Sequence, residues 1–201
     1  GALRRWVAGL LPLVLVLAQT GCPGPSGGKD PIVSAPGTVG VRLLTDSDYL
    51  AALLDGIHQA RQEVCFSFYL FRTMEDGRGG PEAVLQSLVA AAARGVRVEA
   101  ILESNHENDD LDRNNAETAR RLRERGIRVC LDAPDRQTHT KLVVIDRRYV
   151  LIGSHNLTQS ALKYNREASV WIDSAPLAEQ AIRYMESICP QRDGEAGNRR
   201  K

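Results

Sequence analysis

A short apolar run flanked by polar residues constrains the fold of this chain more than any other stretch. Residues 142–145 read Leu-Val-Val-Ile, and His-Thr-Lys precedes them. An apolar, β-branched run of this length is typical of a buried strand. Side chains alternate between the faces of a strand, so we expect His139 and Lys141 to point to one side and Asp146 to the other. A nucleophile and a fixed cation side by side on a rigid element suit chemistry on a phosphate.

Strand patterns and helix patterns alternate along a domain expected over residues 41–190, with a polar tail over 191–201. This alternation predicts an α/β fold in which a central mixed, mostly parallel β-sheet is flanked by helices on both faces. A turn at Arg147-Arg148 is expected to make one strand pair antiparallel. Residues 103–115 are expected to form a polar, acidic loop before a helix over 116–125.

Residues 1–22 carry the pattern of a secretory signal peptide. Arg4 and Arg5 form a positive start, and residues 6–17 form an apolar run that is shorter than a membrane span. A stretch rich in Gly, Pro and Ser follows at once, which favours a signal peptide over a short core helix or a retained anchor. We therefore expect an exported protein that is periplasmic, secreted or anchored to a membrane.

Two processing routes are open at this signal. Cleavage after Ala18 would use small residues, whereas the Gly-Cys pair ending at Cys22 resembles the end of a bacterial lipoprotein signal, where the cysteine is acylated. A lipid on Cys22, followed by a flexible linker over residues 23–40, would attach the domain to a membrane surface.

The remaining cysteines have no metal-binding spacing. Cys65, Cys130 and Cys189 fit no zinc motif. An oxidising compartment permits a disulfide, but the sequence does not select a pair. Cys65 and Cys130 lie in apolar strand patterns, where buried free thiols are also common.

A second polar element, Gly-Ser-His-Asn, occupies residues 153–156. Ser154 and Asn156 share parity, so an extended segment would direct both side chains the same way and His155 the other way. Hydrolysis of a phosphodiester needs donors on the non-bridging oxygens, a nucleophile and an acid for the leaving oxygen. Lys141, Ser154 and Asn156 are candidate phosphate-binding residues, and His139 could form a phosphohistidine.

Together these elements resemble the HxKxxxxD signature of the phospholipase D superfamily and its trailing GSxN element, in particular the small, single-motif endonuclease-like branch. The resemblance implies a phospholipase D-like fold and a two-step, metal-independent route without a cofactor. The sequence shows no carboxylate cluster with magnesium or zinc spacing beside the motif.

The resemblance also assigns roles to three residues outside the phosphate-binding set. Asp146 and Gly153 match structural positions, and we expect Asp146 to hold the turn around Arg147-Arg148. Glu167 matches an acidic position whose carboxylate hydrogen-bonds the catalytic histidine, so the expected catalytic set is His139, Lys141 and Glu167. A solvated glutamate at a strand start is the alternative for Glu167.

The chain holds a single copy of the motif. The nucleophile and the acid must lie on opposite sides of phosphorus, and one His139 cannot occupy both positions. We therefore expect a homodimer whose two-fold axis passes through the active site and brings both His139 side chains to the phosphate.

Two substrate classes are open. The formal net charge is only +1, so nucleic-acid binding would need a local basic patch. The compact single-motif form favours a nuclease acting on DNA or RNA, while export favours a phospholipid substrate. A phosphate-binding module without catalysis and a structural lipoprotein with an incidental motif are further alternatives. The candidate phosphate contacts are Arg72, Arg78, Arg147, Arg148 and Arg166, and the weaker histidine candidates are His58, His106 and His155.

Overall fold

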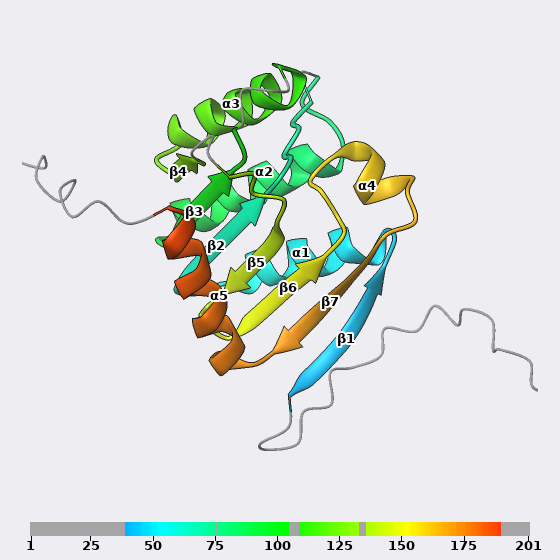
Figure 1. Ribbon diagram of the computed structural model, residues 1–201, viewed down its shortest axis with the longest axis vertical. Helices are drawn as coiled ribbons and strands as arrows, with labels where there is room; N and C mark the ends of the chain where they lie inside the picture. Colours follow the sequence, from blue (N-terminus) through cyan, green and yellow to red (C-terminus); the bar gives the residue numbers. More distant parts are fainter. Residues whose placement is uncertain (1–38, 75, 105–108, 133–135, 190–201) are drawn as a thin grey trace, which may run out of the picture. The chain divides into compact units, whose positions relative to one another are not determined.

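The computed structural model describes residues 39–74, 76–104, 109–132 and 136–189. The proposed signal peptide, Cys22, residues 23–38 of the proposed linker, the polar tail and His106 lie outside the described residues, whereas Gly40 already belongs to the first strand. One seven-stranded sheet forms the centre, in the order β1-β7-β6-β5-β2-β3-β4 (Figure 1). Its strands are β1 (Gly40–Thr45), β2 (Glu63–Phe68), β3 (Arg97–Leu102), β4 (Arg128–Leu131), β5 (Lys141–Ile145), β6 (Tyr149–Gly153) and β7 (Ala168–Asp173).

The mixed character of the sheet is confirmed, but the expectation that parallel pairs dominate is wrong. Strands β2, β3 and β4 pair in parallel, whereas β5 is antiparallel to β2 and the pairs β5–β6, β6–β7 and β7–β1 are all antiparallel. A parallel pair needs a crossover connection of a dozen or more residues, usually a helix. The turn between β5 and β6 is far too short for one, so the chain reverses direction there.

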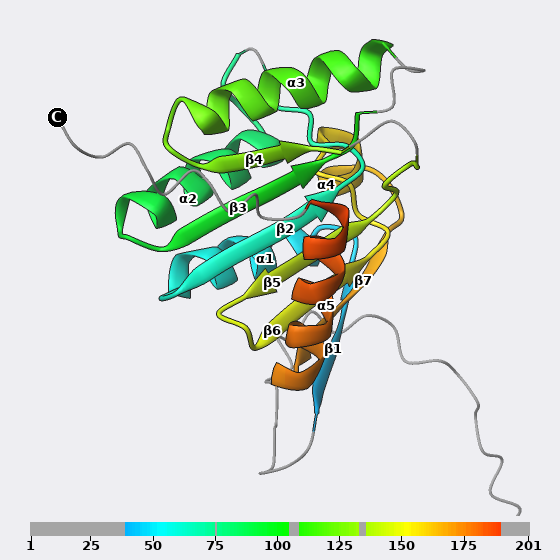
Figure 2. The ribbon, with the colours of Figure 1, turned by 60° about the vertical axis from the view of Figure 1, so that its left-hand side comes forward.

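Helices cover both faces of the sheet, as expected (Figures 1 and 2). One face packs against α1 and α2, with buried side chains such as Leu53, Leu88 and Val143 in its core. The other face packs against α5, which buries Val144 and Val150. The helices are α1 (Asp48–Gln59), α2 (Gly80–Ala93), α3 (Asp109–Arg123), α4 (Gln159–Lys163) and α5 (Ala175–Ile188).

Helix α3 begins earlier than expected. It starts at Asp109, inside the region interpreted as a loop, and its first turn carries Asp109, Asp110 and Asp112. Negative side chains are favourable at the positive end of the helix dipole, so acidity that suggests a loop also suits a helix start. Within the described residues, no helix has the length and apolar character needed to cross a bilayer.

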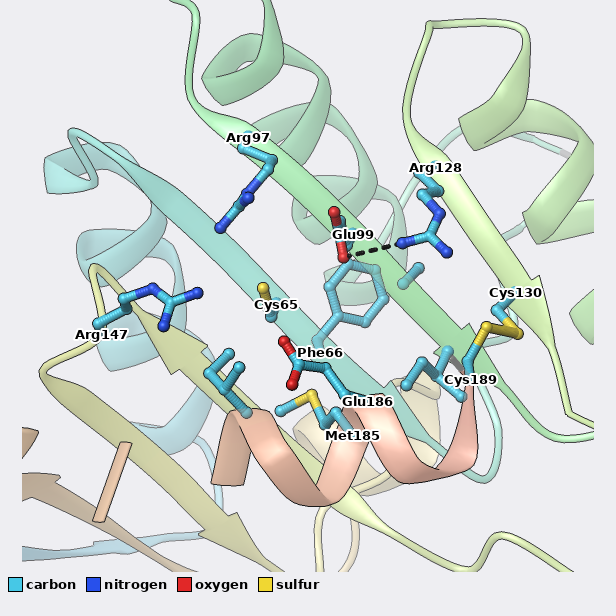
Figure 3. Close-up of a pocket in the computed structure, with 13 residues that line it drawn as sticks. Cys65, Phe66, Arg97, Glu99, Arg128, Cys130, Arg147, Met185, Glu186 and Cys189 are labelled. Atoms are coloured by element: carbon cyan, nitrogen blue, oxygen red, sulfur yellow. Dashed lines mark hydrogen bonds and ion pairs between the residues drawn. A yellow bond between two sulfur atoms is a disulfide. The ribbon is translucent and has the colours of Figure 1, made fainter. Parts of the chain in front are cut away.

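A disulfide joins Cys130 on β4 to Cys189 at the end of α5 (Figure 3). The two cysteines are 59 residues apart in the sequence, and their Cα atoms lie 6.4 Å apart. They line a cavity between α5 and the strands β2, β3 and β4. Cys65 lines the same cavity as a buried free thiol. The bond therefore anchors the last helix to a strand with which it shares few other contacts.

We predict that Cys130→Ser lowers the free energy of unfolding by about 2–4 kcal/mol, because the cross-link restricts the unfolded chain. Urea unfolding under non-reducing conditions measures the change. Adding a reductant should lower the free energy of unfolding of the native protein to that of the variant and leave the value of the variant unchanged. Equal stability of the two proteins without reductant would contradict the prediction.

Candidate active site

His139 and Lys141 lie together at the start of β5, as the strand pattern predicts. His139 is exposed and directly precedes the strand, while Lys141 is buried as its first residue. The Lys141 Nζ lies 3.1 Å from Nδ1 and 3.2 Å from Nε2 of the imidazole, and it donates to the His139 carbonyl oxygen at 3.1 Å. The cation is therefore fixed against the ring.

His139 is exposed, yet partial desolvation by its neighbours and the nearby cation both act on its ring. Desolvation lowers the pKa of His139, and the positive charge of Lys141 lowers it further. Burial also lowers the pKa of Lys141, while the charge of Glu167 opposes that change. A lowered pKa keeps the imidazole neutral near pH 7, which leaves a nitrogen lone pair available for attack.

Tyr69 completes the immediate surroundings of His139, and the sequence analysis missed it. The centroids of the two rings lie 4.4 Å apart, and the Lys141 Nζ lies 5.1 Å from the Tyr69 centroid. Phe68 pairs with Lys141 across β2 and β5, which brings the next residue, Tyr69, beside the histidine. Only the pairing of these strands reveals the contact.

Glu167 is close to the site but does not contact the histidine in the expected way. Among the described residues its carboxylate accepts hydrogen bonds from the Ser154 hydroxyl and from Asn165 Nδ2, the latter at 3.0 Å. The Ser154 hydroxyl in turn accepts from the backbone N–H of Ala168 at 3.0 Å. The imidazole of His139 instead contacts Lys141. Glu167 thus orients Ser154 directly, and it acts on Lys141 through its charge.

Asn156 presents an unused polar atom. Its side chain is half-buried, and its Oδ1 atom is buried without a hydrogen-bond partner in the described part of the chain. A buried amide oxygen normally has a partner, and an amide flip would place a donor at the same position. Asn156 therefore keeps hydrogen-bonding capacity available for a ligand.

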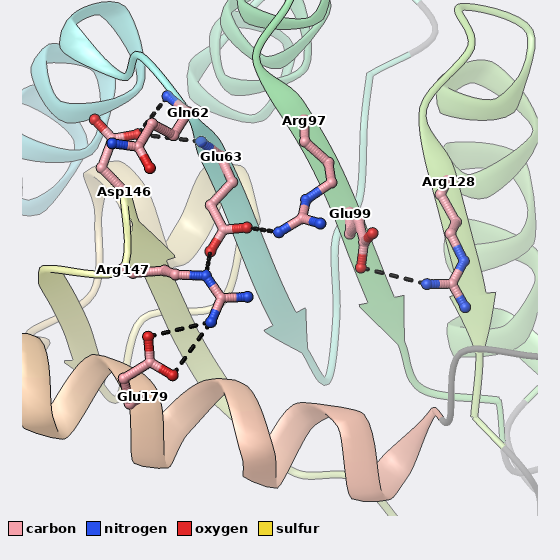
Figure 4. Close-up of polar contacts among 8 residues, drawn as sticks. All are labelled: Gln62, Glu63, Arg97, Glu99, Arg128, Asp146, Arg147 and Glu179. Atoms are coloured by element: carbon pink, nitrogen blue, oxygen red, sulfur yellow. Dashed lines mark hydrogen bonds and ion pairs between the residues drawn. The ribbon is translucent and has the colours of Figure 1, made fainter.

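Gly153 and Asp146 both make contacts within the fold. A Cβ atom on Gly153 would lie 2.4 Å from the Cα of Ser169, so only glycine permits this approach of β6 to β7. The Asp146 carboxylate accepts backbone hydrogen bonds from Arg61 at 3.0 Å, from Gln62 at 2.8 Å and from Glu63 at 3.1 Å (Figure 4). Asp146 thus begins the β5–β6 turn, but its side chain holds the segment before β2.

A second layer of residues supports Glu167 from behind. His155 is fully buried, stacks on Tyr49, donates from Nε2 to the Asp46 carbonyl at 2.9 Å and accepts at Nδ1 from Ser169 at 2.7 Å. Asp46 and Glu167 exchange two further hydrogen bonds of 3.0 Å, one from each backbone N–H. His155 therefore points away from Ser154 and Asn156, as expected, and it has a defined structural role.

Two of the five candidate arginines, Arg147 and Arg148, form ion pairs at the far end of β5. Arg147 pairs with Glu63 and Glu179 (Figure 4), and Arg148 pairs with Asp173. Both follow the far end of β5, and a strand rises about 3.3 Å per residue, so their expected role as phosphate contacts at His139 is wrong.

The other candidate arginines and His58 are either ion-paired or exposed. Arg72 pairs with Asp110, whereas Arg78 and Arg166 are exposed. His58 is exposed in the last turn of α1, away from the site. Across the described ranges, no three His, Cys, Asp or Glu side chains are grouped so that they could hold a metal ion.

The fold and the histidine–lysine pair define a phospholipase D-like domain, and comparison with known proteins agrees. The family model described as "Cardiolipin synthase, PLD-like domain" matches residues 53–189. The chain therefore belongs to the phospholipase D superfamily, whose members are phosphodiesterases.

Curated relatives share about the same region of the chain. Cardiolipin synthase A of Pectobacterium atrosepticum is 30% identical over 141 residues, which cover 65% of this chain and 28% of that protein. Phospholipase D of Rickettsia bellii is 28% identical over 130 residues, covering 65% of this chain and 58% of that protein. The chain thus matches less than two thirds of the length of either relative.

Two solved structures share the fold over nearly their whole length. Nuc from Salmonella typhimurium, a phospholipase D family member, has a TM-score of 0.64 at 23% identity, covering 75% of this chain and 94% of that chain. NucT from Helicobacter pylori has a TM-score of 0.58 at 25% identity, covering 75% of this chain and 96% of that chain. The similarity supports the fold with its mixed sheet and flanking helices.

We predict that Lys141→Met raises the pKa of His139, because the variant removes the nearby positive charge while the partial desolvation of the exposed ring by its other neighbours remains. A titration of the His139 ring followed by NMR measures the shift. The matched variant Lys163→Met removes an exposed cation that does not act on His139, so it should leave the titration unchanged. An unchanged or lower titration midpoint in Lys141→Met would show that the charge of Lys141 does not lower the pKa of the His139 ring.

We also predict that acidification destabilises the protein through His155. Burial lowers the pKa of His155, while its bond to the Asp46 carbonyl and the charges of Glu167 and Asp46 oppose this. Its stabilising contribution is therefore present above the unfolded pKa of about 6.5 and declines below it, by at most about 1.4 kcal/mol per pH unit.

Urea unfolding between about pH 7.5 and 5.5 tests this prediction around the unfolded pKa of histidine. His139 has a lowered pKa as well and acts in the same direction, so the variant His155→Gln isolates the buried ring. The variant should show a shallower loss of stability on acidification. An equally steep loss would assign the effect to other groups.

Proposed function

We propose that this protein hydrolyses phosphodiesters through a covalent phosphohistidine, without a metal ion or cofactor. The contact between the exposed His139 ring and the buried Lys141 ammonium carries the proposal. A nitrogen of His139 attacks phosphorus, and the bond from phosphorus to the leaving oxygen breaks. Lys141, Ser154 and Asn156 bind the non-bridging oxygens and stabilise the charge that develops there.

The leaving oxygen needs a proton from the opposite side of phosphorus, and we assign this step to His139 of the partner subunit in a homodimer. In the second step this histidine removes a proton from water, the oxygen of that water attacks phosphorus, and the bond between His139 and phosphorus breaks. Both histidines then return to their starting states. Glu167 serves as a positioning residue, since its carboxylate holds Ser154 and its charge acts on Lys141.

A nucleic-acid strand is the proposed substrate. The compact single-motif form supports it, as do the exposed side chains of Arg78 and of Arg166, which is adjacent to Glu167. A phospholipid is the second candidate, because the curated relatives are named cardiolipin synthase and phospholipase D. Export and a lipid on Cys22 remain part of the proposal and would bring the enzyme to a membrane surface.

We predict that His139→Asn lowers phosphodiesterase activity by at least about 10³-fold, because the nucleophile and the acid are both lost. The purified protein is assayed with EDTA on plasmid DNA, RNA, phosphatidylcholine vesicles and a chromogenic phosphodiester. His58→Asn is the matched control, since His58 is exposed at the end of α1 that is remote from the site. It should retain full activity.

The outcomes of this assay separate the alternatives. Cleavage of DNA or RNA alone supports the nuclease, and cleavage of phosphatidylcholine alone supports the phospholipase. Activity that vanishes with EDTA would overturn the metal-independent route. Binding of nucleic acid without cleavage by the native protein would favour a phosphate-binding module.

A further inference from the structure

A second cavity lies at the end of the sheet opposite to His139. It is an open cleft with a volume of about 950 Å³, which is within the range of ligand pockets. Ile145 and Asp146, at the far end of β5, contribute to its walls, so the length of β5 separates the cleft from His139. We call it the arginine cleft, because four arginines line it: Arg42, Arg61, Arg94 and Arg148.

Two of the four arginines are engaged by other groups. Arg148 pairs with Asp173, and Arg94 donates to two backbone carbonyl oxygens at the end of α1, both at 3.0 Å. Arg42 and Arg61 form no ion pair within the described ranges. Two guanidinium groups of the cleft therefore remain available to a ligand.

The carboxylates of the arginine cleft do not neutralise these two cations. Asp146 is saturated, since its carboxylate accepts hydrogen bonds from three consecutive backbone N–H groups (Figure 4). Asp55 is exposed on α1 and forms no ion pair within the described part of the chain. With four guanidinium groups and two carboxylates in its walls, the cleft attracts anions.

Two buried donors in the arginine cleft have no acceptor. The Nε atom of Arg42 and the Nε1 atom of Trp171 are buried without a hydrogen-bond partner in the part of the chain that the structure describes. Arg42 lies directly opposite Trp171 in the β1–β7 register, so both side chains project from the same face of the sheet. Both groups can only donate, and buried polar groups normally have a partner. The pair therefore requires a ligand that accepts hydrogen bonds.

The indole of Trp171 is fixed between the sheet and α1. It is 8% exposed, and a Cβ atom on Gly56 of α1 would lie 2.7 Å from its Cη2 atom. Only glycine at this position allows the helix to approach the ring so closely. Tyr149 packs beside it, with the two ring centroids 5.3 Å apart. The donor of Trp171 is thus held in place before any ligand binds.

We propose that the arginine cleft binds a phosphate monoester. Guanidinium groups match the geometry of phosphate oxygens, and two available cations match the charge of about −1.5 to −2 that such a group carries at pH 7. The volume of the cleft leaves room for an organic group beside Tyr149. Because both unpartnered donor atoms are covered, we expect the half-buried Arg42 side chain to move toward the phosphate and to uncover the indole N–H.

NMR of the Trp171 indole N–H in the full chain tests the proposal, with inorganic phosphate and phenyl phosphate as probes. The chain has two tryptophans, and Trp171→Phe assigns their signals. Each probe should shift the Trp171 signal saturably. Arg42→Gln should raise the dissociation constant at least about tenfold, because one charge-assisted donor is lost.

Two further variants separate the cleft from a general effect of charge. Arg61→Gln, at an exposed position of the cleft, should weaken binding as well, and it decides the test if Arg42→Gln does not fold. Arg183→Gln removes an exposed arginine from α5, on the other face of the sheet, and should bind like the native protein. Thermal unfolding by circular dichroism establishes which variants are folded.

Four outcomes would overturn or separate the proposals. A Trp171 signal that phosphate leaves unchanged would overturn the cleft site, as would equal dissociation constants in the native protein and both folded cleft variants. A response that Lys141→Met abolishes would assign the phosphate to the proposed active site instead. Equally tight binding of acetate would overturn the choice of a phosphate. A native protein that binds phosphate as expected but cleaves no phosphodiester would refute the proposed function and leave the cleft site standing.

Discussion

The carboxylate of Asp146 holds the register on which the site depends. It accepts hydrogen bonds from three consecutive backbone N–H groups before β2, and the Asp146 N–H donates to the Glu63 carbonyl at 2.9 Å. Five residues after Glu63 along β2, the same register places Phe68 opposite Lys141, and it brings Tyr69 beside His139. A shift of one residue would reverse the faces of every side chain on β5. The aspartate thus controls, from a distance, which groups meet at the His139 end of β5.

The second constraint is the close contact of β6 with β7 at Gly153. It aligns the Ser154 hydroxyl with the Glu167 carboxylate, and Asp46 fixes the backbone of Glu167 through two hydrogen bonds. His155 then packs beneath this pair as a neutral, buried ring. The residues between Gly153 and Asn156 therefore alternate between the site and its support, because successive side chains of an extended segment face opposite ways.

Local patterns in the sequence were sufficient to predict the strand, the pairing of His139 with Lys141 and the two-sided α/β sheet. Contacts between distant segments were not predictable in this way. The role of Tyr69, the Asp46 support and the Cys130–Cys189 bond all depend on which strands become neighbours. Arg147 and Arg148 show the opposite error, since proximity to the motif in sequence suggested phosphate contacts. A strand of five residues separates them from His139, and acidic side chains pair with both.

The proposed reaction needs more than one chain supplies. Under the proposed function His139 is the nucleophile, and the acid for the leaving oxygen must act from the opposite side of phosphorus. A monomer would therefore lack one of the two proton-transfer groups, and a second His139 across the phosphate would supply it. Under this proposal, the association of two chains and the assembly of the active site are one equilibrium.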